Sequence, residues 1–227
     1  MHLLIPAAGM GKRMGSNRNK LLITLLGKPL LAWTLIAAEN AASISWIGII
    51  GQPEDRSDLE DILGNISLSK PVQLIQGGST RQESVYNGLQ GLPEGVERVL
   101  IHDGARCLAT PDLFDRCAAV LMTCPGLIAA VTVKDTIKVV DKMGIVVDTP
   151  DRANLWAAQT PQGFEVSLLK SCHEQGRTLG WEVTDDAALF EKCNLPVTIV
   201  PGEETNLKIT TPVDLAIAEF IFRSRDS

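Results

Sequence analysis

The sequence of 227 residues lacks several features that would assign it to a class at once. It has no apolar stretch near the roughly 20 residues that a membrane-spanning helix needs. Its five cysteines are scattered and none forms a CxxC pair, so the sequence indicates neither a zinc site nor a disulfide framework. The amino-terminal apolar run is too short for a signal peptide. We therefore expect no membrane association and a cytoplasmic location, or an organelle stroma if a transit peptide has been removed.

Positive charge is also scarce. The net charge of −6 at pH 7 argues against a general nucleic-acid-binding protein, so we expect no nucleic-acid partner. Any anionic ligand must instead be bound by local clusters of lysine and arginine. Hydrophobic residues make up 45% of the chain, which over this length is enough for one sizeable core. We therefore expect a single domain over residues 1–227.

The two best-known nucleotide-binding loops are absent as well. The stretch from Leu3 to Lys20 reads LLIPAAGMGKRMGSNRNK, which lacks the Walker spacing and misses the GxGxxG spacing by one residue. It is an apolar run that opens into a small, glycine-rich, basic turn. This pattern predicts a buried strand leading into a phosphate-binding loop, in which Arg13 and Lys20 can neutralise a polyphosphate. The same pattern also fits a turn that binds nothing.

Apolar runs alternate with amphipathic segments along the chain. Near-continuous apolar runs are typical of parallel strands covered on both faces. We expect strands at 3–5, 46–50, 72–75, 99–102, 127–133 and 197–200. Proline in a first turn and capping patterns indicate helix starts near Pro29, Pro53, Ser79, Thr110, Val166, Thr184 and Thr211. The alternation predicts an α/β fold with a mostly parallel sheet.

Two further segments follow the expected strands at 72–75 and 99–102. Gly77 and Gly78 form a second glycine turn, with Arg81 and Ser84 on the first turns of the next helix. Asp103 comes directly after a buried strand, where a carboxylate can ligate Mg²⁺ or cap a helix, and both interpretations remain open. In open α/β sheets the carboxyl edge of the strands is where ligands bind.

The alternation is interrupted once, between Asp135 and Thr149. Two β-branched runs flank Lys142-Met143-Gly144, which predicts a β-hairpin. An extended hairpin with this much exposed valine and isoleucine needs covering. We therefore expect it to pack on another subunit.

Taken together, the segments resemble the 2-C-methyl-D-erythritol 4-phosphate cytidylyltransferase family of the non-mevalonate isoprenoid pathway. The matching pieces, in the family's order, are PAAGMGKRM with Lys20, GGSTRQESVYNGL, VLIHDGAR, DTIK, DRANLWAAQTPQ, TDDAALFE and NLKITTPVDLAIAE. The resemblance implies a Rossmann-like nucleotidyltransferase domain that works as a homodimer. The hairpin arm of each subunit, at about 135–152, would reach over the other subunit's active site. The implied reaction is cytidylyl transfer from CTP to 2-C-methyl-D-erythritol 4-phosphate, with release of pyrophosphate and with Mg²⁺ as cofactor.

The resemblance also implies roles for individual residues. The implied catalytic residues are Arg13, Lys20, Arg152 and Lys208, the first two stabilising the transition state and the last two positioning the acceptor phosphate. The residues implied in CTP binding are Ala7, Ala8, Gly9, Gly78, Ser79, Ser84 and Gly104, and the position of Arg81 adds it to this set. On the acceptor side the implied residues are Arg106, Thr136, Arg152 and Lys208. Asp103 would hold the metal.

The chain departs from the family pattern at two places. Lys20 is followed by Leu21 and Leu22, where the family usually has glutamine and tyrosine. The family's usual HDAARP stands here as HDGARC, with Gly104 and Cys107. Gly104 gains room, so we expect it to be tolerated, whereas the leucines alter the local shape around Lys20.

The implied chemistry needs no general base, because the nucleophile is a phosphate monoester oxygen that is already ionised at pH 7. The difficulty is electrostatic, since one anion must attack another, and positioning with charge neutralisation is the remedy. We interpret His102, which adjoins Asp103, as a strand-end residue rather than a base. The main alternatives are a cytidylyltransferase for another polyol phosphate, such as ribitol 5-phosphate, and a cytidine-nucleotide-binding protein without transferase activity. A NAD-dependent dehydrogenase is disfavoured by the glycine spacing.

Overall fold

A computed structural model of the chain describes residues 1–8 and 19–225. Within these residues the centre is a sheet of seven strands in the order β11-β7-β10-β6-β1-β4-β5. The strands are β1 (His2–Pro6), β4 (Trp46–Gly51), β5 (Val72–Gln76), β6 (Arg98–Ile101), β7 (Gly126–Thr132), β10 (Trp156–Glu165) and β11 (Thr198–Pro201). Strand β10 is antiparallel to β6 and β7, and the other pairs are parallel. The predicted mostly parallel α/β sheet is confirmed.

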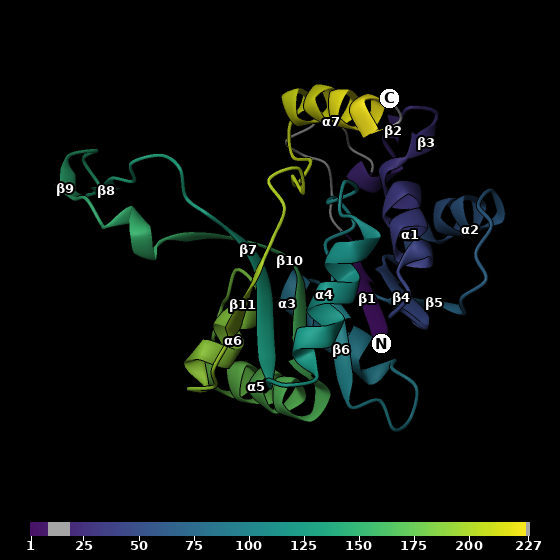
Figure 1. The fold of residues 1–227 in the computed structure, drawn as a ribbon. Coiled ribbons are helices and arrows are strands. Elements are labelled where there is room, and N and C mark those ends of the chain that lie inside the picture. Colours follow the sequence, from purple (N-terminus) through teal and green to yellow (C-terminus); the bar gives the residue numbers. More distant parts are fainter. Residues whose placement is uncertain (9–18, 226–227) are drawn as a thin grey trace.

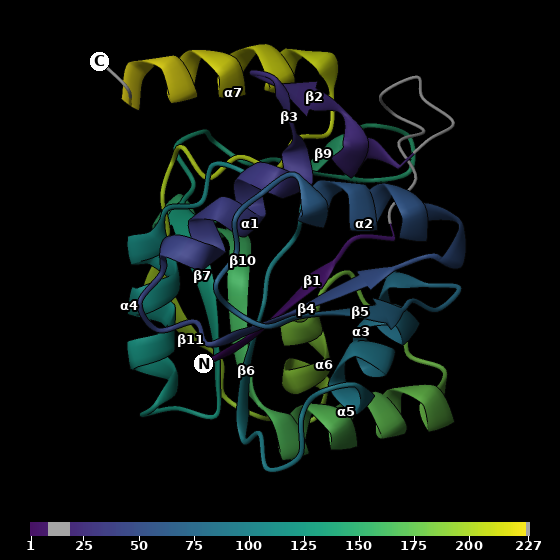
Figure 2. The same cartoon turned by 90° about the vertical axis from the view of Figure 1, so that its right-hand side faces the viewer.

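Helices cover both faces of this sheet (Figure 2). They are α1 (Leu30–Asn40), α2 (Arg56–Gly64), α3 (Arg81–Gln90), α4 (Pro111–Leu121), α5 (Val166–Leu179), α6 (Asp186–Lys192) and α7 (Pro212–Arg225). Helices α1, α2 and α4 share a buried apolar cluster with one face, and α3, α5 and α6 share a second cluster with the other. All residues of β4 are buried, as expected for a strand between two helical layers.

Strand β10 is an element that the sequence patterns did not predict. Its segment contains Gln159, Pro161 and Gln162, which are poor indicators of a buried strand. The pairing with β7 shifts register between Ala158 and Gln162, so the proline falls in the irregular part of the ladder. This antiparallel strand brings the QTPQ segment beside the end of β6.

Two helix starts differ by one residue from the prediction. The side chain that caps α3 is Thr80, which accepts a hydrogen bond from the backbone of Glu83, and not Ser79. Helix α6 is capped by Asp185 rather than by Thr184. At α7 the predicted pattern is confirmed, because the Asp214 carboxylate accepts from the backbone N–H of Thr211 and Thr211 Oγ1 accepts in return.

The segment between β7 and β10 extends away from the sheet (Figure 1). It contains the short antiparallel strands β8 (Val139–Val140) and β9 (Val146–Asp148), so the predicted hairpin strands are present. The segment exposes large apolar side chains at Ile137, Val139, Val140, Met143, Ile145, Val146 and Val147. We call residues 135–152 the arm.

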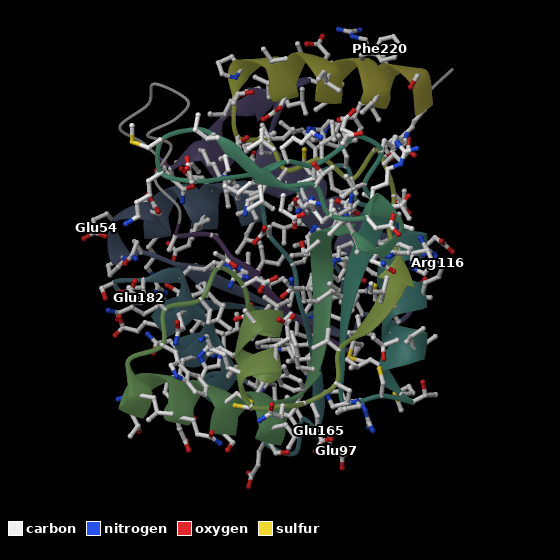
Figure 3. The ribbon with its side chains drawn as sticks, turned by 90° about the vertical axis from the view of Figure 1, so that its left-hand side faces the viewer. Glu54, Glu97, Arg116, Glu165, Glu182 and Phe220 are labelled. Carbon is white, nitrogen blue, oxygen red and sulfur yellow. The ribbon has the colours of Figure 1, made fainter. Side chains whose placement is uncertain are left out.

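Helix α7 lies across the carboxyl edge of the sheet, over the two-stranded pair β2 (Thr24–Leu25) and β3 (Lys28–Pro29). Figure 3 shows Phe220 projecting outward from α7, while Glu97 and Glu165 lie at the opposite end of the molecule. The inner side of α7 packs through Ala218 into a small cluster with Leu30 and Ile209. Among the described helices, none has the length and apolar character needed to cross a bilayer.

Candidate active site

A cavity of about 210 Å³ opens at the carboxyl ends of β1, β4, β5 and β6. These four strands are parallel neighbours, so the loops that follow them meet at one edge. The lining residues are Pro6, Ala8, Lys20, Leu21, Gln52, Gly78, Ser79, Thr80, Arg81, Ser84, Asp103, Ala105 and Lys208. Many of the site residues implied by the resemblance are therefore brought together here.

Asp103 is the electrostatic centre of the cavity. Its Oδ2 lies 2.7 Å from Lys208 Nζ, and its carboxylate lies 3.9 Å from both Arg81 Nη2 and Arg106 Nε. Burial alone would raise the pKa of the Asp103 carboxyl, but the charges of Lys208, Arg81 and Arg106 outweigh burial and lower this pKa to about 2. Asp103 is therefore ionised at any physiological pH.

Arg81 is held from behind by a second carboxylate. Its Nη2 donates to Asp186 Oδ2 at 2.8 Å, and the Asp186 side chain is only 1% exposed. Burial would lower the pKa of Arg81, but Asp186 and Asp103 raise it, so the guanidinium keeps its charge. Because Arg81 is the first residue of α3, this pair fixes a cation at the cavity wall.

The second glycine turn is fixed by side chains around it. Gly78 N–H donates to Ser84 Oγ at 3.0 Å, and Gln52 Nε2 donates to Gly78 O at 2.9 Å. Ser79 donates both its N–H and its hydroxyl to Glu83 Oε2 at 2.7 Å. The turn after β5 is thus rigid at the point where it lines the cavity.

The first loop contributes its two ends to the described site. Ala8 lines the cavity, whereas Ala7 is fully buried and donates its N–H to Ile50 O. Lys20 Nζ donates to Ile209 O at 3.4 Å, which places this lysine beside the loop that carries Lys208. Gly9 and Arg13 lie outside the described residues.

The acceptor-side predictions divide into two groups. Lys208 lines the cavity, and Arg106 lies behind it with its guanidinium donating to Asn206 O at 2.8 Å. Thr136 and Arg152 are exposed in the arm, outside the cavity lining of their own chain. Arg152 Nη1 donates to Lys134 O at 2.9 Å. One chain alone therefore does not bring Thr136 and Arg152 to the site.

Asp103 is the candidate ligand for a magnesium ion. Among the described residues, no three histidine, cysteine, aspartate or glutamate side chains converge as a cage. Mg²⁺ often takes one or two carboxylates and completes its shell with water and substrate phosphates. An ionised Asp103 on the cavity wall fits this mode of binding.

The two departures from the family pattern meet in space. A Cβ atom built on Gly104 would lie 2.7 Å from Leu21 Cδ1 and 3.2 Å from Ile5 Cγ2. Leu21 is buried, so its side chain has little space into which it could move. The room left by Gly104 is therefore occupied by the leucine that follows Lys20.

Several polar residues of the site were missed from the sequence. Gln52 follows β4 and supports the second glycine turn, and a polar residue directly after a buried strand was the available signal. Asn206 is fully buried and donates to Gln159 Oε1 and to Thr160 O. Its role could not be inferred, because β10 itself was not predicted.

An α/β sheet whose carboxyl edge gathers lysine and arginine around one ionised carboxylate is suited to join two phosphate-bearing substrates. A fold and site of this kind are typical of the nucleotidyltransferases. The family model for 2-C-methyl-D-erythritol 4-phosphate cytidylyltransferase matches residues 1–224. The proteins of that name from Crocosphaera subtropica and Microcystis aeruginosa are 74% and 73% identical over 225 residues. These alignments cover 99% of this chain and 99% or 100% of the relatives.

Solved structures agree with the sequence relatives. The 4-diphosphocytidyl-2C-methyl-D-erythritol synthase of Anaerococcus prevotii superposes with a TM-score of 0.87 at 32% identity, covering 98% of this chain and 97% of that one. The 2-C-methyl-D-erythritol 4-phosphate cytidylyltransferase of Thermus thermophilus gives 0.78 at 31% identity, covering 97% and 98%. The chain belongs to the 2-C-methyl-D-erythritol 4-phosphate cytidylyltransferase family.

The contact between Gly104 and Leu21 predicts coupled substitutions. Gly104→Ala should cost about 1–3 kcal/mol of unfolding free energy, because the added methyl meets the Leu21 side chain. In the double variant Gly104→Ala, Leu21→Ala the loss should be smaller than the sum of the single losses by about 0.5 kcal/mol or more. Denaturant unfolding of the four proteins measures this coupling, and strictly additive losses would contradict it.

The depressed pKa of Asp103 predicts a pH dependence of stability. Because the folded-state pKa of about 2 lies below the ordinary value of 3.8, the Asp103 charge contributes stability above about pH 4. This contribution is lost as the pH falls from about 4 towards 2. The difference in unfolding free energy between wild type and Asp103→Asn should be constant near neutral pH and change below about pH 4. A difference that does not vary down to about pH 3 would contradict the assignment.

Proposed function

We propose that this chain transfers the cytidylyl group of CTP to 2-C-methyl-D-erythritol 4-phosphate and releases pyrophosphate, with the residues of the Asp103 cavity as its active site. The observation that carries this assignment is the set of three cations, Lys208, Arg81 and Arg106, fixed around one carboxylate at the carboxyl edge of the sheet. The family membership supports the choice of CTP and the acceptor.

The reaction is a displacement at the α-phosphorus of CTP. An oxygen of the acceptor phosphate forms the new bond, and the bond to pyrophosphate breaks. The attacking oxygen is already ionised, so no side chain has to remove a proton. The protein must hold two anions in contact and stabilise the charge that develops. The cations of the cavity supply that stabilisation.

The nucleotide occupies the side of the cavity formed by the loops after β1 and β5. Ala8, Gly78 and Ser79 line this side with small residues, which lets a base and ribose lie close to the backbone. Ser84 also lines the cavity, and the buried Ala7 and Gly104 lie behind its wall. Gly9 completes the set assigned to CTP together with Arg81. Lys20 and Arg13 neutralise its phosphates, with Arg81 at the cavity wall.

The acceptor phosphate binds where Lys208 and Arg106 converge. Lys208 is paired with Asp103 at 2.7 Å in this structure, so its ammonium is already aimed into the cavity. Because the two substrates repel each other, a second set of cations apart from Lys20 is needed. Mg²⁺, when bound, would be held by Asp103 and would neutralise phosphate charge in the way these side chains do.

The arm supports a homodimer in which each active site uses both subunits. It exposes seven large apolar residues and carries Thr136 and Arg152 away from the cavity of its own chain. Covering the arm on a second copy would bury that apolar surface. Thr136 of the partner subunit and the partner's Arg152 would then reach the acceptor side of the cavity.

Substitution of Lys208 should lower the rate of cytidylyl transfer while the protein still folds. With CTP, Mg²⁺ and 2-C-methyl-D-erythritol 4-phosphate, the wild type should release pyrophosphate, and Lys208→Met should lower kcat/KM by about 10²–10³, as for loss of one transition-state donor. Lys192→Met is the matched control, because Lys192 is an exposed lysine on α6 beside Trp181 and not in the cavity lining. Turnover of ribitol 5-phosphate alone, or unchanged turnover by Lys208→Met, would reject the assignment.

The shared active site predicts complementation between inactive variants. In a mixed dimer of Lys208→Met and Arg152→Met, one site has both Lys208 and the partner's Arg152. Mixing the two after dissociation should restore about a quarter of wild-type turnover, because about half of the dimers are mixed and one site in each is intact. The control mixture of Lys208→Met with Lys20→Met should stay inactive, since both residues belong to the same site. No recovery in the first mixture would show that the arm does not act across the dimer.

A further inference from the structure

The turn that carries Asp103 and Arg106 has its backbone polar groups engaged almost throughout. Asp103 N–H donates to Thr160 Oγ1 at 3.0 Å, and Asp103 O accepts from Arg106 N–H at 2.9 Å. Gly104 O accepts from the buried Thr34 hydroxyl at 3.0 Å. A turn held from this many sides keeps its side chains in one orientation.

His102 closes this turn on its buried side. The residue is fully buried, and its Nε2 lies 3.2 Å from Arg106 O while its Nδ1 lies 2.9 Å from Thr160 Oγ1. A carbonyl oxygen only accepts, so Nε2 must carry the ring proton. The Thr160 hydroxyl already accepts from Asp103 N–H and can donate its own hydrogen to Nδ1. One consistent set of hydrogen bonds thus links Asp103, Thr160, His102 and Arg106.

Asn206 extends the same network to the loop of Lys208. Asn206 is fully buried, and its Nδ2 donates to Thr160 O at 2.8 Å and to Gln159 Oε1 at 3.1 Å. Its backbone oxygen accepts from Arg106 Nη1 at 2.8 Å. The residue after Lys208, Ile209, donates its N–H to Ala105 O at 2.9 Å. Lys208 therefore stands between two anchored positions.

We infer that His102 and Asn206 are positioning residues, which set the placement of Asp103, Arg106 and Lys208 relative to one another through Thr160 without contacting substrate. The inference rests on the proposed function and deepens it. Both residues are buried and neither lines the cavity, so a direct role in binding is not available to them. They join three segments far apart in the sequence, the turn after β6, strand β10 and the loop after β11.

Substituting His102 or Asn206 should displace Asp103, Arg106 and Lys208, and so lower activity without removing any of their charges. A misplacement of about 1 Å at an active site can cost about 10²-fold in rate. Loss of residues that orient functional side chains typically costs about 10–100-fold. The nucleotide side, built on the loops after β1 and β5, has its own hydrogen bonds and should keep its affinity for CTP.

Two substitutions at His102 distinguish the effect of its hydrogen bond to Arg106 O from the effect of its side-chain packing. In His102→Gln the amide Nε2 can still donate to Arg106 O, whereas His102→Leu keeps similar bulk and loses the donor. Asn206→Asp is nearly isosteric and turns a donor into an acceptor facing Thr160 O and Gln159 Oε1. Phe164→Leu, in the apolar core on the other side of the sheet, is the control for loss of stability alone.

We expect His102→Leu and Asn206→Asp to lower kcat/KM for the acceptor by about 10–100-fold, with the dissociation constant for CTP within about threefold of wild type. His102→Gln should recover to within about threefold of wild type. Phe164→Leu should lower the melting temperature with kcat and both KM values unchanged. Wild-type kinetics in His102→Leu would overturn the inference, as would equal losses in His102→Gln and His102→Leu. If Asn206→Asp does not fold, the His102 pair still decides the question.

Measurements that do not depend on catalysis can test the positioning role separately from the proposed function. In the ¹⁵N spectrum of the wild type, His102 should have a protonated Nε2 and a bare Nδ1, with His102→Gln used to assign the signals. Hydrogen exchange at the Asp103 and Ile209 amides should be slow in wild type and His102→Gln, and faster in His102→Leu. Unchanged exchange in His102→Leu would overturn the positioning role even if the enzyme is active. An absence of pyrophosphate release by wild type would instead reject the proposed function.

Discussion

The pairing of one half-buried carboxylate, Asp103, with three cations is the interaction on which the site depends. Asp103 pairs with Lys208 at 2.7 Å and lies 3.9 Å from both Arg81 and Arg106, although these residues come from the loop after β11, the start of α3 and the turn after β6. Asp186 and Asn206 O hold the two arginines from behind at 2.8 Å. Three like charges would otherwise repel each other and turn towards solvent. The carboxylate allows the chain to fold with a cationic cavity already assembled, despite a net charge of −6. An anionic substrate then meets a preformed site, which is the condition for electrostatic catalysis.

The fold explains how residues from distant segments reach that point. Parallel neighbours β6, β1, β4 and β5 deliver their following loops to the same edge of the sheet. The antiparallel β10 is inserted beside β6, so that Thr160 and Gln159 can bind the loop of Lys208. The same layout leaves the arm outside the body of its own subunit (Figure 1). The proposed homodimer would bring the arm residues Thr136 and Arg152 of one subunit to the cavity of the other.

Much of this architecture could be predicted from the sequence, and the parts that could not have physical reasons. The apolar runs that end at Ile5 and Ile101, shortly before a glycine-rich turn and before Asp103, located the parallel strands and the carboxyl edge. Strand β10 was missed because its buried face carries Gln159 and Gln162, which are satisfied by tertiary hydrogen bonds that no local pattern encodes. The contact between Gly104 and Leu21 could not be predicted either. The two residues are 83 positions apart in the sequence, and only the tertiary fold brings them together. Gly9 and Arg13 lie outside the described residues, so Gly9 is assigned from the resemblance, and Arg13 from the resemblance and the basic loop pattern.

Asp103 is the one carboxylate within 4 Å of all three cations, Lys208, Arg81 and Arg106, among the described residues. The most direct measurement is therefore pyrophosphate release by Asp103→Asn at saturating CTP and acceptor, with folding checked by the melting temperature. We expect a fall in kcat of about 10²–10³ in a folded protein, because the cations lose the carboxylate paired with them and a bound metal loses its ligand. Turnover equal to that of the wild type would contradict it and would place the reaction elsewhere.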